Sequence, residues 1–76
     1  MNFDRELDTQ GLECPLPILK TKKALNELAP GQVLRVLATD PGSRRDMVAF
    51  ANQTGHALLH AGEEDGTLVF LLRKKG

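Results

Sequence analysis

The chain has no tryptophan and no tyrosine, and its three aromatic residues are all phenylalanine. A core made from such a sequence must consist mostly of leucine, valine, isoleucine and alanine. Basic and acidic residues number 10 each, so the formal net charge is zero. A nucleic-acid-binding module normally needs a basic surface and aromatic side chains that stack on bases, so the sequence speaks against direct nucleic-acid binding.

Cysteine is also scarce, since Cys14 is the only one in the 76 residues. An internal disulfide and a zinc site built from cysteines are therefore excluded. A free thiol fits a reducing, cytoplasmic compartment. No signal-peptide pattern opens the chain, and no apolar run approaches the ~18 residues of a membrane helix, so we expect no membrane partner.

What the chain does contain is the segment Gly-Leu-Glu-Cys-Pro-Leu-Pro at 11–17, which places the thiol directly before a helical pattern. Prolines fit the first positions of a helix, where the N–H groups have no intrahelical partner. With Cys14 as the N-cap, Pro15 and Pro17 occupy the first and third helical positions, and the Leu16 N–H is free to face the sulfur. The positive end of the helix dipole is then expected to favour the reactive thiolate.

Apolar periodicity predicts the order strand, helix, strand, helix, strand, strand. The first two strands, joined by a helix, should form a right-handed parallel unit, and the last two an antiparallel hairpin with an acidic loop. Two helices then cover one face of a four-stranded mixed sheet, which is an α/β two-layer sandwich. The predicted strands are 3–9, 32–39, 56–61 and 67–73, the helices are 15–28 and 43–54, and the loop is 62–66.

Two local expectations follow from this arrangement. Ser43 followed by Asp46 is typical of a capping box at the start of the second helix. The sheet face that the helices leave uncovered should expose Val69 and Leu71.

Helical spacing places one set of residues on the core face of the predicted first helix: Pro17, Ile18, Thr21, Ala24, Leu25 and Leu28. The helix also carries apolar residues outside this face. Leu16 and Leu19 fall on the flank, close to Lys20 and Lys23 and within two turns of Cys14. Two interpretations remain open: the leucines pack under a neighbouring loop, or the group forms a partner-docking patch beside the thiol.

The charged residues near the second helix also allow two interpretations. Arg44 and Arg45 fall in its first turn, where cations oppose the helix dipole, so they are either solvated surface residues or functional ones. The charge of Glu13 opposes a thiolate, and we expect its side chain to face solvent or a partner.

The chemistry open to Cys14 is limited by what accompanies it. The sequence places neither His56 nor His60 near the sulfur, so no base is assigned to it. A two-cysteine redox relay needs a second thiol, which the chain lacks. The remaining interpretation is a single activated thiol that exchanges with a partner, and a buried, inert cysteine fits poorly beside Glu13 and Gly11.

These residues resemble the signature of the TusA/SirA/YedF family of small sulfur-carrier proteins. The resemblance covers essentially the whole chain, so we expect one carrier domain over residues 1–76, and the family fold is the same two-layer sandwich. It rests on Leu7-Asp8, Gly11-Leu12, Cys14-Pro15-Leu16-Pro17, Thr39-Asp40-Pro41, Arg45-Asp46 and Gly55-His56.

The resemblance implies a sulfurtransferase-type function. Cys14 would be the catalytic residue, taking sulfane sulfur as a persulfide from a cysteine desulfurase or rhodanese-type donor. It would relay the sulfur to an acceptor protein, DsrE- or TusD-like in type, for tRNA thiolation, molybdenum-cofactor maturation or sulfur oxidation. The implied protein is a cytoplasmic monomer without cofactor or metal. Its docking residues would be Leu16, Leu19, Lys20, Lys23 and Arg45, and its site-shaping residues Asp8, Gly11, Pro15 and Pro17.

Two other classes of function stay open at this point. A thiol-based redox-sensing or regulatory module would use Cys14 to form mixed disulfides without carrying sulfur. A nucleic-acid-binding domain could use a related two-layer fold, against the zero net charge.

Overall fold

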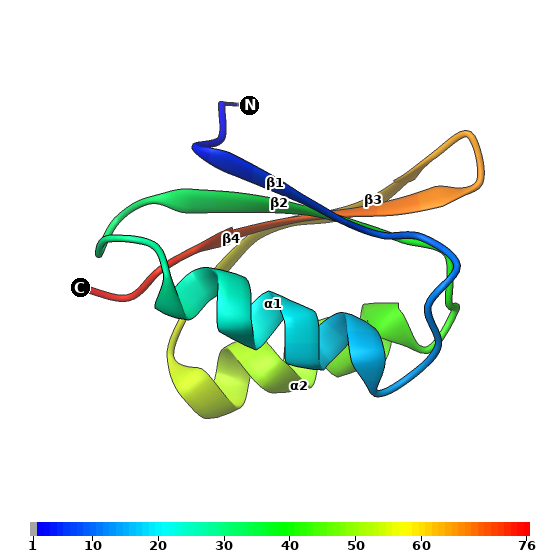
Figure 1. Ribbon diagram of the computed structural model, residues 1–76, viewed down its shortest axis with the longest axis horizontal. Helices are drawn as coiled ribbons and strands as arrows, with labels where there is room; N and C mark the ends of the chain where they lie inside the picture. The colour runs from blue at the N-terminus through cyan, green and yellow to red at the C-terminus, as the bar shows by residue number, and fades with distance from the viewer. Residues whose placement is uncertain (1) are drawn as a thin grey trace.

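Two helices pack on one face of a four-stranded sheet in the computed structural model, which describes residues 2–76 (Figure 1). The strand order is β1-β2-β4-β3, with β1 and β2 parallel and the other pairs antiparallel. The predicted two-layer sandwich is confirmed. The elements are β1 (Arg5–Thr9), α1 (Leu16–Asn26), β2 (Val33–Ala38), α2 (Ser43–Thr54), β3 (Ala57–Glu64) and β4 (Thr67–Arg73).

The hydrophobic core lies between the sheet and the two helices. Every second residue of β2 faces this core, because successive side chains of a strand point to opposite faces. Phe70, on the adjacent strand β4, is the largest fully buried side chain. As the composition predicts, aliphatic residues form most of the core, including Leu25, Leu34, Val36, Leu68 and Leu72.

The start of α2 differs from the predicted capping box. The N-cap residue is Gly42, and no side chain caps the helix. The Ser43 hydroxyl is buried and has no hydrogen-bond partner. The prediction is wrong because the preceding turn continues directly into the helix: the Ser43 N–H donates to the Asp40 carbonyl at 3.0 Å, which makes Ser43 the first helical residue.

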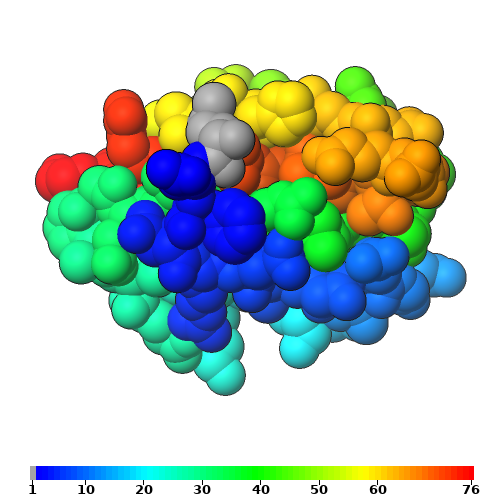
Figure 2. All heavy atoms as spheres, turned by 90° about the horizontal axis from the view of Figure 1, so that it is seen from above, coloured from blue at the N-terminus to red at the C-terminus, as the bar shows by residue number. Residues whose placement is uncertain are grey.

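The sheet face opposite the helices is covered by long side chains. Val69 and Leu71 are only 3% and 5% exposed, so the prediction that they face solvent is wrong. The Arg35 guanidinium lies 5.5 Å from the centre of the Phe3 ring, and it also pairs with Glu6. Phe3, Arg35, Val69 and Leu71 line one shallow hollow there. Figure 2 views this face and shows the N-terminal residues, in blue, lying against it.

The β3–β4 hairpin is tighter than predicted. The acidic loop expected at 62–66 is wrong, because β3 continues to Glu64. The turn consists of Asp65 and Gly66, whose φ angles of 51° and 82° are both positive, as a two-residue hairpin turn requires. The strand β3 also has a shift in register, a β-bulge, at 58–60.

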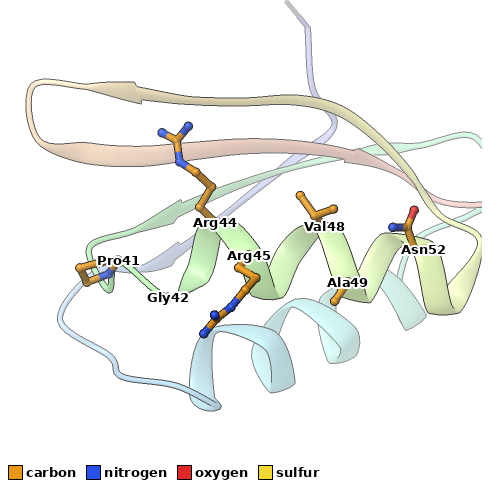
Figure 3. Close-up of a pocket in the computed structure, with 7 residues that line it drawn as sticks. All are labelled: Pro41, Gly42, Arg44, Arg45, Val48, Ala49 and Asn52. Atoms are coloured by element: carbon orange, nitrogen blue, oxygen red, sulfur yellow. The ribbon is translucent and has the colours of Figure 1, made fainter.

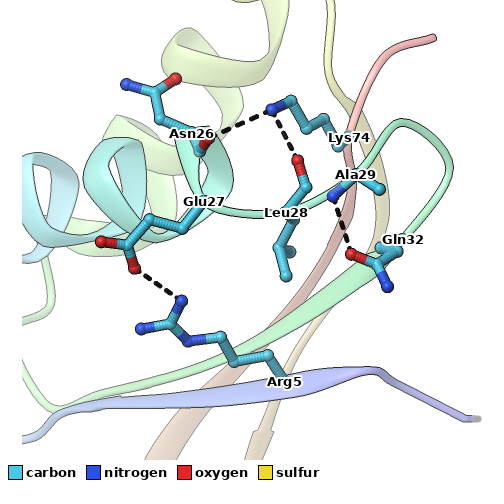
Figure 4. Close-up of polar contacts among 7 residues, drawn as sticks. All are labelled: Arg5, Asn26, Glu27, Leu28, Ala29, Gln32 and Lys74. Carbon is cyan, nitrogen blue, oxygen red and sulfur yellow. Dashed lines mark hydrogen bonds and ion pairs between the residues drawn. The ribbon is translucent and has the colours of Figure 1, made fainter.

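The C-terminal end of α1 is joined to the sheet by polar contacts (Figure 4). Arg5 of β1 donates to the Glu27 carboxylate at 2.7 Å. The Lys74 ammonium donates to the Leu28 carbonyl at 2.7 Å, and so gives a partner to a carbonyl just beyond the end of the helix. Further bonds in this region join Ala29 to Gln32 and Lys74 to Asn26.

The helices are short and amphipathic. Over residues 2–76, neither is long and apolar enough to cross a membrane.

Candidate functional site

Cys14 lies at the edge of the sheet where the parallel strands β1 and β2 both end. The loop after β1 carries the cysteine, and the loop after β2 carries Thr39 and Asp40. The Gly11 N–H donates to the Thr39 hydroxyl at 2.8 Å, and the Cys14 N–H donates to an Asp40 carboxylate oxygen at 3.3 Å. The second loop therefore holds the first one, while the Cys14 thiol stays free and exposed.

The helix begins one residue later than the sequence predicts. Pro15 is the N-cap, and Leu16 and Pro17 are the first two helical residues. The Leu16 N–H donates to the Glu13 carbonyl at 2.8 Å, so it does not face the sulfur. The prediction that Cys14 caps the helix is wrong because a turn from Glu13 to Leu16 precedes the first helical turn.

Cys14 lines a hollow of about 260 Å³ that lies between the starts of α1 and α2. Pro15 and Ile18 line it on the side of α1, and Asp46, Ala49 and Gln53 on the side of α2. Its wall is mostly apolar, and within the described residues 2–76 Asp46 is the one ionisable side chain that lines it besides Cys14. The thiol therefore has a carboxylate as its immediate polar neighbour.

The charges around Cys14 oppose the thiolate. Hydrogen bonding to the Asp46 carboxylate, followed by desolvation and by the charges of Asp46 and Asp40, raises the pKa of the Cys14 thiol above its ordinary value of 9.0. Arg45 acts in the opposite direction and lowers that pKa. The expectation that the site favours the thiolate is wrong, because the two carboxylates outweigh the one cation.

Arg45 and Arg44 point in different directions from the start of α2. In Figure 3 the Arg45 side chain extends toward the first turn of α1, which agrees with its effect on Cys14. Arg44 extends toward the β3–β4 hairpin. Among residues 2–76 neither arginine forms an ion pair. Arg45 is therefore the cation of the cysteine site, and Arg44 belongs to the neighbouring surface.

The predicted docking residues form an exposed stripe on α1. Leu16 and Leu19 are 44% and 54% exposed, so the interpretation that they pack under a loop is wrong. Lys20 and Lys23 are also exposed. Lys20 lies four residues after Leu16, and Lys23 four after Leu19, so each pair is adjacent on the helix surface. The stripe begins directly after Cys14.

Two of the four predicted site-shaping residues, Asp8 and Gly11, lie at the end of β1 and in the loop that follows it. An Asp8 carboxylate oxygen accepts a hydrogen bond from the Gln10 N–H at 2.9 Å. Gly11 has a φ of 83°, a left-handed conformation that favours glycine. These contacts fix the path of the chain that leads to Cys14.

The two histidines lie away from the cysteine hollow. The His56 ring packs against Phe50 with 5.8 Å between ring centres, and its Nδ1 accepts a hydrogen bond from the Lys75 N–H. Burial is the main cause that lowers the pKa of His56. His60 lines the hollow on the opposite face of the sheet. Within the described part of the chain, no group of three histidine, cysteine, aspartate or glutamate side chains is arranged to hold a metal ion.

Sequence reasoning missed the two carboxylates next to the thiol. It used Asp46 as a capping residue, Asp40 as part of a turn, and both as parts of the family resemblance, and it placed neither beside Cys14. The signal that could have found Asp40 is the parallel pairing of β1 and β2, because the loops after two parallel neighbours meet at one edge. Asp46 lies in α2, about one helical turn after the first helical residue, Ser43.

Comparison with solved structures first defines the class of fold. The crystal structure of a SirA-like protein from Desulfitobacterium hafniense matches with a TM-score of 0.85 and 29% sequence identity. The match covers 96% of this chain and 100% of that one. The arrangement described above is thus a SirA-like fold.

Comparison of sequences then gives the family. The family model described as "Sulfurtransferase TusA" matches residues 5–74. The "Sulfur carrier protein TusA" of Allochromatium vinosum is 58% identical over 73 residues, which cover 96% of each chain. The "Putative sulfur carrier protein YrkI" of Bacillus subtilis is 47% identical over 74 residues, which cover 97% of this chain and 99% of that one. The chain belongs to the TusA family of sulfurtransferases and sulfur carriers.

Proposed function

We propose that the protein carries sulfur as a persulfide on Cys14, taking it from a protein donor and passing it to a protein acceptor. The observation that carries the proposal is the single thiol, free and exposed at the sheet edge between the starts of two helices. The names of the relatives support it, because they are called sulfur carriers at up to 58% identity.

The transfer is an exchange between two sulfur atoms and needs no external oxidant. The Cys14 sulfur, once deprotonated, attacks the outer sulfur of a persulfide on the donor's cysteine. The donor's S–S bond breaks while a new S–S bond forms at Cys14, and the donor's cysteine leaves as a thiolate that takes up a proton. In balance, the Cys14 thiol and the donor persulfide become the Cys14 persulfide and the donor thiol.

The neighbouring charges have opposite roles in this exchange. The Asp46 carboxylate favours the protonated thiol in the resting protein, because its charge and hydrogen bond raise the pKa of Cys14. Arg45 supplies the positive charge that favours a sulfur anion. A persulfide is more acidic than a thiol. The loaded form of Cys14 therefore ionises more readily than the resting thiol, and Arg45 favours the resulting anion.

The surface around Cys14 serves to receive the partners. Leu16 and Leu19 provide exposed apolar area, and Lys20 and Lys23 provide charge along the same stripe. The loop is shaped by Asp8, Gly11, Pro15 and Pro17.

Donor, acceptor and location complete the proposal. The donor is a cysteine desulfurase or a rhodanese-type protein, and the acceptor is a DsrE- or TusD-like protein. Together they serve tRNA thiolation, molybdenum-cofactor maturation or sulfur oxidation. Residues 1–76 act as one carrier domain and as a monomer. The free thiol is kept reduced in the cytoplasm.

The test is to transfer sulfur to the protein and to measure its intact mass by mass spectrometry. The protein is incubated with a cysteine desulfurase and L-cysteine in the absence of an acceptor. A mass increase of about 32 Da on Cys14, which dithiothreitol removes, is the expected result for one sulfane sulfur atom. If desulfurase and rhodanese donors leave the mass unchanged, while peroxide and glutathione give only sulfenic acid or a glutathione adduct, Cys14 is a redox sensor and the carrier proposal is wrong.

A further inference from the structure

A second hollow, larger than the one that contains the thiol, adjoins it along α2. A groove of about 730 Å³ runs along the outer side of α2, whereas the hollow around Cys14 measures about 260 Å³. We call it the α2 groove, and Figure 3 draws its lining. The residues that line it are Pro41, Gly42, Arg44, Arg45, Val48, Ala49 and Asn52.

The floor of the α2 groove is apolar and open to solvent. Val48 is 43% exposed, although its neighbours on α2, Met47 and Ala51, are buried. Ala49 lines both the α2 groove and the hollow around Cys14, so the two surfaces are continuous. A partner segment in the groove therefore ends beside the thiol.

The rim of the groove is positively charged. Arg44 and Arg45 lie in the first turn of α2, where a cation faces the positive end of the helix dipole. Among residues 2–76 they form no ion pair, whereas Arg5 and Arg35 are both paired with glutamates. Because the helix dipole does not stabilise these two arginines, their guanidinium groups are available to a partner. A guanidinium group is planar and can donate two hydrogen bonds to one carboxylate.

From this complementarity we infer that the α2 groove receives an acidic segment of the protein that delivers sulfur to Cys14. Carboxylates of the segment pair with Arg44 and Arg45, and an apolar side chain between them covers Val48. We assign the segment to the donor, because the proposed exchange begins when a donor reaches the Cys14 thiol and the groove adjoins the hollow that contains this thiol. Among residues 2–76, the side chains that line the groove include no aromatic ring on which a base could stack, so a nucleic acid fits it less well.

This inference rests on the proposed function. It predicts that the groove affects the binding of the donor protein and not the sulfur exchange at Cys14. If the groove only docks the donor, its variants should impair loading by a protein donor and leave loading by a small molecule unchanged. The variants are Arg44→Glu and Val48→Asp, made separately in the full chain. Both positions are exposed, so the fold should tolerate them. The matched control is Arg73→Glu, the same charge change on an exposed arginine at the far end of β4.

The experiment compares two sulfur donors for each variant. With a cysteine desulfurase and L-cysteine, kcat/KM for loading should fall by about tenfold or more in Arg44→Glu and in Val48→Asp, because each change removes or repels one anchor of the interface. With glutathione persulfide as donor, the loading rate should stay within about twofold of the wild type. Arg73→Glu should load normally from both donors.

Each contrary outcome has a distinct meaning. Normal desulfurase loading of both groove variants overturns the inference, and so does an equal loss in Arg73→Glu, which would show a net-charge effect only. An equal loss with glutathione persulfide shows damage at the thiol and also overturns it. A wild-type dimer that Val48→Asp abolishes assigns the groove to a second copy. If the wild type loads from neither donor, the proposed function itself fails, and the inference fails with it.

Discussion

The two ends of α1 use charged residues in opposite ways. At the C-terminal end, Glu27 pairs with Arg5, and Lys74 caps a carbonyl (Figure 4). At the N-terminal end, about 16 Å away along the helix axis, Asp46 and Arg45 flank Cys14 without an ion pair within residues 2–76. One end cross-links the layers, and the other leaves its charges available for chemistry.

The comparison indicates that the charged residues near the thiol can stay unpaired with little loss in the free energy of unfolding. Exposed ion pairs contribute little to stability, because water screens them and the side chains lose freedom in forming them. The stability of this protein comes from the buried core, which both ends share. The thiol end can therefore keep its carboxylates and arginines for a partner.

The largest expected effect is that of Cys14→Ser. Sulfur loading should fall to background, because the chain has no other cysteine to hold a persulfide. The thiol is exposed, so the midpoint of thermal unfolding should stay within about 2 °C of the wild-type value. Intact mass and calorimetry measure the two results. A large drop in the unfolding midpoint would instead make Cys14 a structural residue.

Asp46→Asn should change the reactivity of the thiol without removing it. The Asp46 carboxylate raises the pKa of Cys14, so a neutral amide should lower that pKa and increase the thiolate fraction at neutral pH. The rate of alkylation by iodoacetamide, measured against pH, should show its midpoint at a lower pH than in the wild type. Arg45→Gln should move the midpoint the other way. Glu27→Gln, which removes a carboxylate at the other end of α1, is the control and should leave the midpoint unchanged.

Lys74→Met should affect only the cross-linked end of α1. The variant loses the partly buried hydrogen bond from Lys74 to the Leu28 carbonyl, so the free energy of unfolding should fall by about 1 kcal/mol. Urea titration measures the change, and sulfur loading should remain normal. Lys75→Met, at an exposed neighbour, should cost less than about 0.5 kcal/mol. Equal losses in the two variants would contradict the role given to this bond.

The smallest effect is expected for Glu27→Gln. Arg5 lowers the pKa of Glu27 below its ordinary value of 4.5, so the pair stabilises the fold above that pH. This contribution is lost as the pH falls through the lowered pKa. The stability difference between wild type and variant should thus be small at pH 7, shrink in high salt and vanish in acid. Denaturant titrations at several pH values test this, and a difference that persists in acid would refute the assignment.

Much of the fold could be predicted from the sequence, because periodicity is a local signal. The predicted core face of the first helix is confirmed, with Thr21, Ala24 and Leu25 buried. The cover over Val69 and Leu71 could not be predicted, since it depends on Arg35 lying against a distant segment. Long-range contacts of this kind are invisible to a periodic pattern.

The candidate site was predictable only in part. Exposure of Cys14 followed from its polar surroundings and the prolines after it. The position of Asp46 beside the sulfur depends on the exact start of α2, and a shift of one residue turns a helical side chain by about 100°. The expected helix start at Cys14 failed for a similar reason, because the turn that begins at Glu13 competes with the first helical turn.

The bulge at 58–60 bears on how the protein behaves when it is concentrated. β3 lies at an edge of the sheet, where a regular strand would offer unpaired N–H and C=O groups to another chain. The shift in register breaks the repeat of these groups, and Glu63 and Glu64 add like charges at the end of the strand. The edge strand of a second molecule therefore cannot form a regular ladder of hydrogen bonds with β3. The fold thus resists edge-to-edge aggregation through β3.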